Sequence, residues 1–169
     1  AGTSPLEEEL VSAGATVLDR AWRDLDIHGT PLRLGGLYDY AFALDDRNSC
    51  DPDRMDPEVC RFLTDFQDTE RFTLMLSHRP DSFALGEAAR TWSIDLVLSG
   101  HAHGGQVVLP VLGGVFGGDL GLFSPYLHGM CRKDGLTMAV TSGLGSQRER
   151  LPRFHNPPEI MVIDLTPES

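Results

Sequence analysis

Hydrophobic and polar residues alternate along this chain with two different periods, which predict both helices and strands. After Pro57, apolar residues recur at helical spacing and predict an amphipathic helix. The residues on its apolar side are Val59, Phe62, Leu63 and Phe66. An earlier helix is predicted to begin at the Ser4-Pro5 pair and to end at Gly14, because serine and proline favour helix starts and glycine favours helix ends. Residues 82–91 predict a third, short helix.

Short apolar runs bounded by polar residues predict strands. The predicted strands cover residues 15–18, 25–28, 32–38, 72–76, 94–98, 136–141 and 160–165. Residues 45–56 are polar and predict a loop, and the glycine-rich residues 111–121 predict an ordered surface loop. Helices alternate with strands and strands then dominate, which is typical of a layered α/β fold.

Composition narrows the class of protein. The 169 residues fit one ordinary domain, and the net charge of −11 disfavours nucleic acid as a partner. The apolar runs are about five residues long, against the roughly 20 that a spanning helix needs. We therefore expect a soluble chain, while the localisation of a longer parent stays open, including membrane-associated and exported locations in a bacterium. Cys50, Cys60 and Cys131 are expected to be reduced, with a Cys50–Cys60 disulfide as the alternative.

Histidines follow two of the predicted strands. His101 and His103 lie in the sequence Ser-Gly-His-Ala-His-Gly-Gly-Gln, directly after the run 94–98, and His78 follows the run 72–76. Side chains two residues apart on an extended segment point to the same side, so two imidazoles here can bind a metal ion. Gly104 and Gly105 are either ordinary turn residues or positions that let backbone approach a metal and its substrate.

The octapeptide resembles the Gly-His-x-His signature of the calcineurin-like metallophosphoesterases, in the branch with a Gly-Gly-Gln ending. Ser77-His78-Arg79-Pro80 is similar to the strand-end histidine turn of this family. The tail from Thr141 to Gly145, followed by Arg153-Phe154, matches as well. Three other motifs of the family, Asp-x-His, Gly-Asp and Gly-Asn-His, do not occur here in the expected order.

The resemblance implies an α-β-β-α sandwich, of which residues 1–169 are expected to form the C-terminal portion. It also implies two divalent ions (Mn, Fe or Zn), with His78 and His101 on one ion and His103 on the other. No catalytic residue is assigned, because the family's general acid belongs to the missing Gly-Asn-His motif. Gly104, Gly105 and Arg153 are expected to contact the substrate, although Arg153 also fits a solvated basic face.

The leading hypothesis is a metal-dependent phosphoesterase that hydrolyses phosphomonoester, phosphodiester or pyrophosphate bonds, including lipid-linked ones. This chain would supply only the C-terminal ligands and would be inactive alone. The alternative is a non-catalytic metal-binding or interaction module that lost half of the site. A half-sandwich exposes a sheet face, so the expected partner is the missing N-terminal half or a second copy of this chain.

Overall fold

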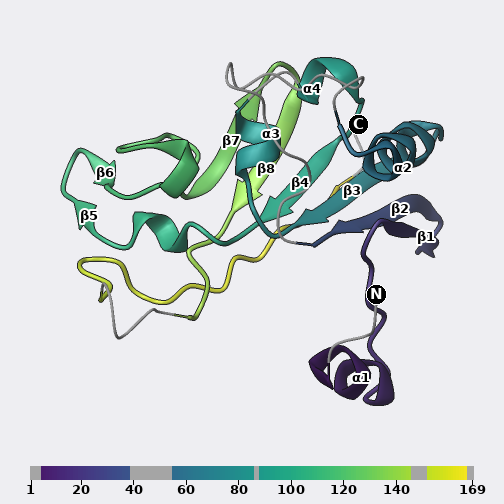
Figure 1. The fold of residues 1–169 in the computed structure, drawn as a ribbon, viewed down its shortest axis with the longest axis horizontal. Helices are drawn as coiled ribbons and strands as arrows, with labels where there is room; N and C mark the ends of the chain where they lie inside the picture. The colour runs from purple at the N-terminus through teal and green to yellow at the C-terminus, as the bar shows by residue number, and fades with distance from the viewer. Residues whose placement is uncertain (1–4, 39–54, 86–87, 146–151, 167–169) are drawn as a thin grey trace.

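The structure is a computed structural model that describes residues 5–38, 55–85, 88–145 and 152–166. Its centre is a mostly parallel sheet of six strands in the order β1-β2-β3-β4-β8-β7 (Figure 1). The strands are β1 (Ala21–Ile27), β2 (Thr30–Leu37), β3 (Phe72–Ser77), β4 (Leu96–Ser99), β7 (Gly129–Lys133) and β8 (Leu136–Val140). The four inner strands are parallel, and β1 and β7 pair antiparallel at the edges.

Helices cover one face of the sheet. The helices are α1 (Pro5–Ser12), α2 (Pro57–Gln67), α3 (Asp81–Ala84) and α4 (Ala88–Thr91). The four predicted apolar residues of α2 are all buried, and they pack with Met75 and Val97 of the inner strands. The α2 helix starts where predicted because the side chain of Asp56 accepts a hydrogen bond from the Glu58 amide. α1 buries none of its residues and lies apart from the sheet, so the helical layer consists of α2, α3 and α4 (Figure 1).

The opposite face of the sheet has a smaller apolar cluster. Leu32, Leu74, Leu96 and Ala139 are buried there, and Met161 and Ile163 of the C-terminal segment pack against them. Since side chains alternate along a strand, Phe72 and Leu76 share this face with Leu74, yet they are 36% and 41% exposed. The structure therefore confirms an α/β fold with one helix-covered face and one incompletely covered face.

Between β4 and β7 the chain leaves the sheet in an excursion, residues 103–128, which lies at one end of the molecule (Figure 1). It contains the 3₁₀ turns η1 (His103–Gly105) and η2 (Gly118–Leu120) and the short strands β5 (Val108–Leu109) and β6 (Gly113–Gly114). The prediction of an ordered loop at 111–121 is thus confirmed. None of the helices formed by the described residues is long and apolar enough to cross a membrane.

Several predicted elements were wrong. Residues 15–18 form no strand, and the helix predicted at 82–91 is broken because Leu85 is extended, so that α3 and α4 each form one turn. Residues 160–165 also form no strand, since Met161 and Ile163 pack over the face of the sheet instead of pairing at an edge. The sequence analysis missed β7, although the turn that joins it to β8, Asp134-Gly135, is a typical hairpin signal.

Two further predictions fall partly or wholly on residues outside the described ranges. The polar loop predicted at 45–56 is described only at its last two residues, and Ser4 and Cys50 lie outside the structure's described part. Cys60 and Cys131 have free thiols, and both are half-buried beside the main core.

Candidate metal centre

The carboxyl ends of β3 and β4 bring His78 and His101 together. These strands are adjacent and parallel, with Leu76 opposite Leu98, so each histidine lies just beyond the end of its strand. The amide of Gly100 donates a hydrogen bond of 3.0 Å to the carbonyl of His78, which joins the two turns. As a result, Nδ1 of His101 lies 3.1 Å from Nε2 of His78, and the ring planes are nearly perpendicular at 79°.

This pair suits a divalent metal by its donor chemistry. Two imidazole nitrogens on one zinc-like ion lie about 2.8–3.4 Å apart, given bonds of about 2.0–2.1 Å and bond angles at the metal between about 90° and 109°. The observed 3.1 Å falls in that range. Both side chains are exposed, so an ion and its water can reach them. His78 and His101 therefore fit as two ligands of one metal.

His103 lies two residues further on, in η1, and is half-buried. Burial lowers the pKa of His103, and the neighbouring Arg153 guanidinium lowers it further, against a hydrogen bond with the Gly145 carbonyl that raises it. A lowered pKa keeps the imidazole neutral at neutral pH, which is the form that binds metals. Nη2 of Arg153 lies 3.4 Å from Nδ1 of His103. Nδ1 therefore faces the guanidinium, and Nε2 is the ring nitrogen on the side away from it.

The backbone of the histidine turn is left-handed at nearly every position. The φ angles of His101, His103, Gly104, Gly105 and Gln106 are 56°, 47°, 62°, 82° and 60°. Non-glycine residues rarely adopt this conformation, so surrounding contacts must stabilise the turn. The strained backbone is a second reason, besides the two histidines, to consider this turn part of a functional site.

Asn156, which the sequence analysis did not select, supplies those contacts. Its buried side-chain amide donates hydrogen bonds of 2.6 Å to the His103 carbonyl and 3.1 Å to the Gln106 carbonyl. An amide that bonds two carbonyls of one strained turn fixes the direction of that turn. No sequence pattern identifies such a residue, because it lies about 50 positions from its partners.

Gly104 and Gly105 are buried and tightly packed. A Cβ at Gly105 would lie 2.7 Å from Cα of Gly114, and a Cβ at Gly104 would lie 2.9 Å from Oδ1 of Asn156. The fold therefore requires glycine at both positions for packing and for φ. Contact with substrate at these glycines stays a prediction.

Arg153 is held mainly by backbone carbonyls. Its guanidinium donates hydrogen bonds to the carbonyls of Ser142, Gly143 and Gly145 and to Oδ1 of Asn156. This side chain thereby ties the C-terminal segment to the residues that follow β8. The contact with the His103 ring places it beside the site, and its role in binding a substrate phosphate stays a prediction.

A cavity of about 350 Å³ lies at the carboxyl ends of the strands, with His78 on its wall. Its other polar lining includes Ser77, Ser99 and Thr141. The buried Oγ of Ser99 has no hydrogen-bond partner among the described residues. A buried hydroxyl with no partner is costly, so a water or ligand oxygen in this cavity would satisfy it.

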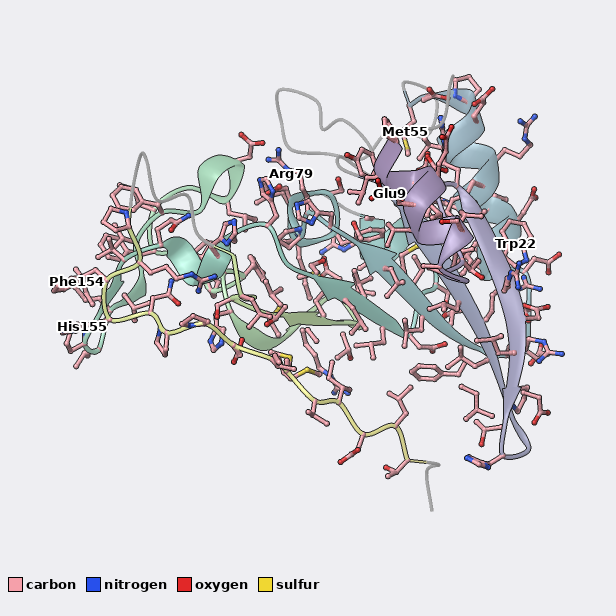
Figure 2. The ribbon with its side chains drawn as sticks, turned by 90° about the horizontal axis from the view of Figure 1, so that it is seen from below. Glu9, Trp22, Met55, Arg79, Phe154 and His155 are labelled. Atoms are coloured by element: carbon pink, nitrogen blue, oxygen red, sulfur yellow. The ribbon has the colours of Figure 1, made fainter. Side chains whose placement is uncertain are left out.

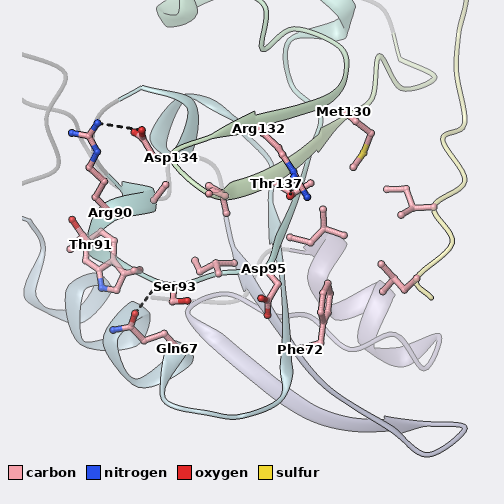
Figure 3. Close-up of a pocket in the computed structure, with 18 of the residues that line it drawn as sticks. Gln67, Phe72, Arg90, Thr91, Ser93, Asp95, Met130, Arg132, Asp134 and Thr137 are labelled. Atoms are coloured by element: carbon pink, nitrogen blue, oxygen red, sulfur yellow. Dashed lines mark hydrogen bonds and ion pairs between the residues drawn. The ribbon is translucent and has the colours of Figure 1, made fainter. Parts of the chain in front are cut away.

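Two larger cavities lie elsewhere. One, of about 670 Å³, is lined by Phe72, Leu96 and Leu136 at the amino ends of the parallel strands, opposite the histidines (Figure 3). Its charged groups Arg90 and Asp134 pair with one another at 3.3 Å. The other, of about 630 Å³, runs from Gly104 along the excursion to Glu159. Of these three cavities, as the described residues line them, the small one alone has a predicted metal ligand, His78, on its wall.

Carboxylates are missing from the described part of this centre. Among the described residues, no three His, Cys, Asp or Glu side chains are grouped so that they could hold one metal ion. His103 interacts electrostatically with His78, but the three histidines do not form a single cluster. Glu159, in the C-terminal segment, pairs with His128 at 2.9 Å.

Comparison with known proteins gives three curated relatives. An uncharacterized metallophosphoesterase of Helicobacter pylori strain J99 is 33% identical over 144 residues, which is 85% of this chain and 34% of the relative. The uncharacterized metallophosphoesterase YkuE of Bacillus subtilis is 29% identical over 97% of this chain and 51% of its own length. A metallophosphoesterase of H. pylori strain 26695 is 30% identical over 99% of this chain and 40% of its own length.

All three relatives are named metallophosphoesterases, which supports that family for this chain. The chain spans about half or less of the length of the curated relatives it matches. No family profile matches the chain, and no solved structure matches it significantly.

Proposed function

We propose that this chain is the C-terminal portion of a metallophosphoesterase domain that hydrolyses a phosphate monoester, phosphate diester or pyrophosphate. The observation that carries the proposal is the 3.1 Å approach of Nε2 of His78 to Nδ1 of His101 at the ends of two parallel strands. Active groups in α/β sheets gather at such carboxyl ends. The names of the three relatives agree with this reaction class.

The relatives' names imply divalent metal cofactors. In this chain, His78 and His101 would hold one ion, and His103 would contribute to a second. Histidine together with oxygen ligands suits Mn, Fe or Zn. Bound ions of this kind supply a hydroxide at neutral pH and neutralise charge on the phosphoryl oxygens.

The other residues of the centre position these ligands. Asn156 fixes the turn that carries His103, and Arg153 connects that turn to the segment after β8. Partial burial and the positive guanidinium of Arg153 both lower the pKa of His103, which favours the neutral form that binds metals. Among the described residues, no third His, Cys, Asp or Glu side chain joins the His78–His101 pair in a group that could hold a metal ion. We therefore infer that the 169-residue chain has little or no activity alone.

The incompletely covered face of the sheet fits this inference. Phe72 and Leu76 remain partly exposed beside the buried Leu74. Exposed apolar sheet faces favour association. We propose that the rest of the same domain covers this face in the longer protein, with a second copy of this chain as the competing occupant. Light scattering of the isolated chain separates the two, because only the second predicts a dimer.

Calorimetric titration of the chain with Zn²⁺ and Mn²⁺ tests the metal ligands. We expect His101→Ala and His78→Ala each to weaken binding by about tenfold or more. His28→Asn is the matched control, because His28 is exposed in the β1–β2 turn and asparagine tolerates its φ of 54°. If His78→Ala and His101→Ala bind Zn²⁺ and Mn²⁺ as tightly as His28→Asn does, His78 and His101 are not metal ligands.

A second experiment tests the reaction. The 169-residue chain and a longer protein that includes preceding residues of the parent are assayed with bis(p-nitrophenyl) phosphate and Mn²⁺. We expect turnover only by the longer protein, and loss of that turnover in its His101→Ala variant. Metal binding without hydrolysis by the longer protein would favour a non-catalytic module. Turnover by the chain alone would contradict the proposed division of the site.

A further inference from the structure

The excursion contacts both turns that carry the proposed metal ligands. On one side, the amide of Phe116 donates a hydrogen bond of 3.0 Å to the carbonyl of Gly105, in the turn formed by η1. On the other side, Asp119 pairs at 2.6 Å with Arg79, the residue that follows His78. Figure 2 shows Arg79 between the strands of the sheet and the excursion. The excursion therefore joins the two ligand turns to one another.

The turn that carries His78 is held at its backbone by two further bonds. The buried hydroxyl of Ser77 donates a hydrogen bond of 3.0 Å to the carbonyl of Arg79. The amide of Gly100 donates a hydrogen bond to the carbonyl of His78, also at 3.0 Å. Both bonds connect the turns at the ends of β3 and β4, and neither reaches the excursion. The ion pair with Asp119 adds a third bond, from a residue 40 positions away.

A second carboxylate on the same guanidinium has a different effect. Asp81 accepts a hydrogen bond of 2.7 Å from Nε of Arg79, but it lies only two residues further along the chain, at the start of α3. This pair is local, so it orients the guanidinium without connecting the turn to the excursion. Asp119 makes that connection, because it belongs to η2.

η2 presents the Asp119 carboxylate from a closed and anchored loop. The amide of Gly117 donates a hydrogen bond of 2.9 Å to the carbonyl of Gly121, which closes the loop around Asp119. The neighbouring side chain of Leu120 is buried in the main core. The position of the carboxylate is therefore fixed relative to the sheet, as the placement of a ligand turn requires.

Asp119 is also the single charged residue of a long uncharged stretch. Residues 104–127 contain no other Asp, Glu, Lys or Arg, in a chain that is 23% charged. This charge lies where the excursion meets Arg79, and the Asp119 side chain is 55% exposed. An ion pair with this exposure contributes little to stability. Placement of the His78 turn accounts for a charge at this position better than stability does.

We propose that Asp119 is a positioning residue of the proposed metal centre and that it acts on His78 through Arg79. The ion pair holds the turn in place, so that Nε2 of His78 stays 3.1 Å from Nδ1 of His101. This inference rests on the proposed function, in which these two histidines hold one metal ion. Without the pair, the turn gains freedom about its remaining bonds, and metal binding must first order the two rings.

Calorimetric titration of the 169-residue chain with Zn²⁺ tests this role in the Asp119→Ala variant. We expect the affinity to fall by about fivefold, less than for a residue that bonds a ligand side chain directly. Asp24→Ala is the matched control, because Asp24 pairs with Arg33 at 2.7 Å and is 37% exposed, but lies on β1. It removes the same charge and should leave the affinity unchanged. Asp119→Glu keeps a carboxylate and should recover most of the affinity.

Proton–nitrogen correlation spectra of the histidine rings in the metal-free chain give a readout that a change in stability alone does not move. Asp119→Ala should shift or broaden the ring signals of His78 and His101, and Asp24→Ala should not. The proposal fails if these signals are unchanged in Asp119→Ala, or if both variants bind Zn²⁺ as tightly as the unmodified chain does. If the unmodified chain binds no Zn²⁺, the proposed function fails instead, and the ring signals alone decide whether Asp119 positions His78.

Discussion

Arg79 forms an ion pair with Asp119, with Nη2 of the arginine 2.6 Å from Oδ2 of the aspartate. Arg79 directly follows His78, and Asp119 lies in η2 of the excursion. The Nε atom of the same guanidinium lies 2.7 Å from Oδ2 of the buried Asp81. One buried arginine therefore connects the turn of the proposed metal ligand His78, the start of α3 and the base of the excursion.

Removal of this guanidinium should destabilise the chain strongly. Arg79→Met leaves the Asp81 carboxylate, 4% exposed, without its ion-pair partner, and we expect a loss of about 3–5 kcal/mol in the free energy of unfolding. Asp119→Asn is the matched control, because the Asp119 side chain is 55% exposed and its loss should cost about 1 kcal/mol or less. Urea unfolding followed by circular dichroism measures both. Equal losses would contradict a buried role for Arg79.

The strands that carry the site were predictable because local pattern determines them. The apolar run at 72–76 and the helical spacing in α2 contain enough information without tertiary contacts, and both predictions are confirmed. The position of His78 and His101 follows from the same pattern, since each comes directly after an apolar run. Their 3.1 Å approach depends on the adjacency of β3 and β4, which no local pattern determines. The family resemblance implied only that the two histidines bind one ion.

The supports of the site were not predictable, because they join residues far apart in the chain. Asn156 bonds a turn about 50 positions earlier, and Arg79 bonds Asp119 across 40 positions. Burial of Arg79 contradicts the usual preference of arginine for the surface. β7 was missed for a different reason, because its residues alternate between exposed and half-buried and show no apolar run.

Substitution of Gly105 tests the packing of the histidine turn. Gly105→Ala places a Cβ 2.7 Å from Cα of Gly114 at a φ of 82°. Gly113→Ala is the matched control, with a φ of 81° but no atom within 4 Å. Both should lose about 1 kcal/mol from left-handed strain, and Gly105→Ala should lose about 1–3 kcal/mol more from the clash. Chemical unfolding measures the difference, and similar losses would show that the turn can expand freely.

Asn156 should affect both stability and metal binding. Asn156→Ala removes the two hydrogen bonds to the His103 and Gln106 carbonyls, and we expect a loss of about 1–3 kcal/mol in the free energy of unfolding. Zn²⁺ affinity should fall as well, because the strained turn loses its fixed direction. His155→Asn is the matched control at the exposed neighbouring residue, where asparagine tolerates the φ of 50°, and it should change stability by about 0.5 kcal/mol or less. Unchanged Zn²⁺ affinity in Asn156→Ala would separate this residue from the metal centre.

Glu159 should make the free energy of unfolding depend on pH in the acidic range. A hydrogen bond from His128, helped by the Ser142 amide and the Thr141 hydroxyl, lowers the pKa of Glu159 from 4.5 to about 2. Because the pKa is lower in the folded state, this carboxylate stabilises the fold fully above pH 4.5, and the stabilisation is lost as the pH falls from 4.5 toward 2. Its side chain is 30% exposed, so solvent screening limits the loss between pH 6 and pH 3 to about 1–2 kcal/mol. Urea unfolding at pH 6 and at pH 3 measures the loss in the free energy of unfolding. The unmodified chain should lose about 1–2 kcal/mol more than Glu159→Gln, whose amide does not titrate. If both proteins lose the same stability, the carboxylate has an ordinary pKa in the folded chain.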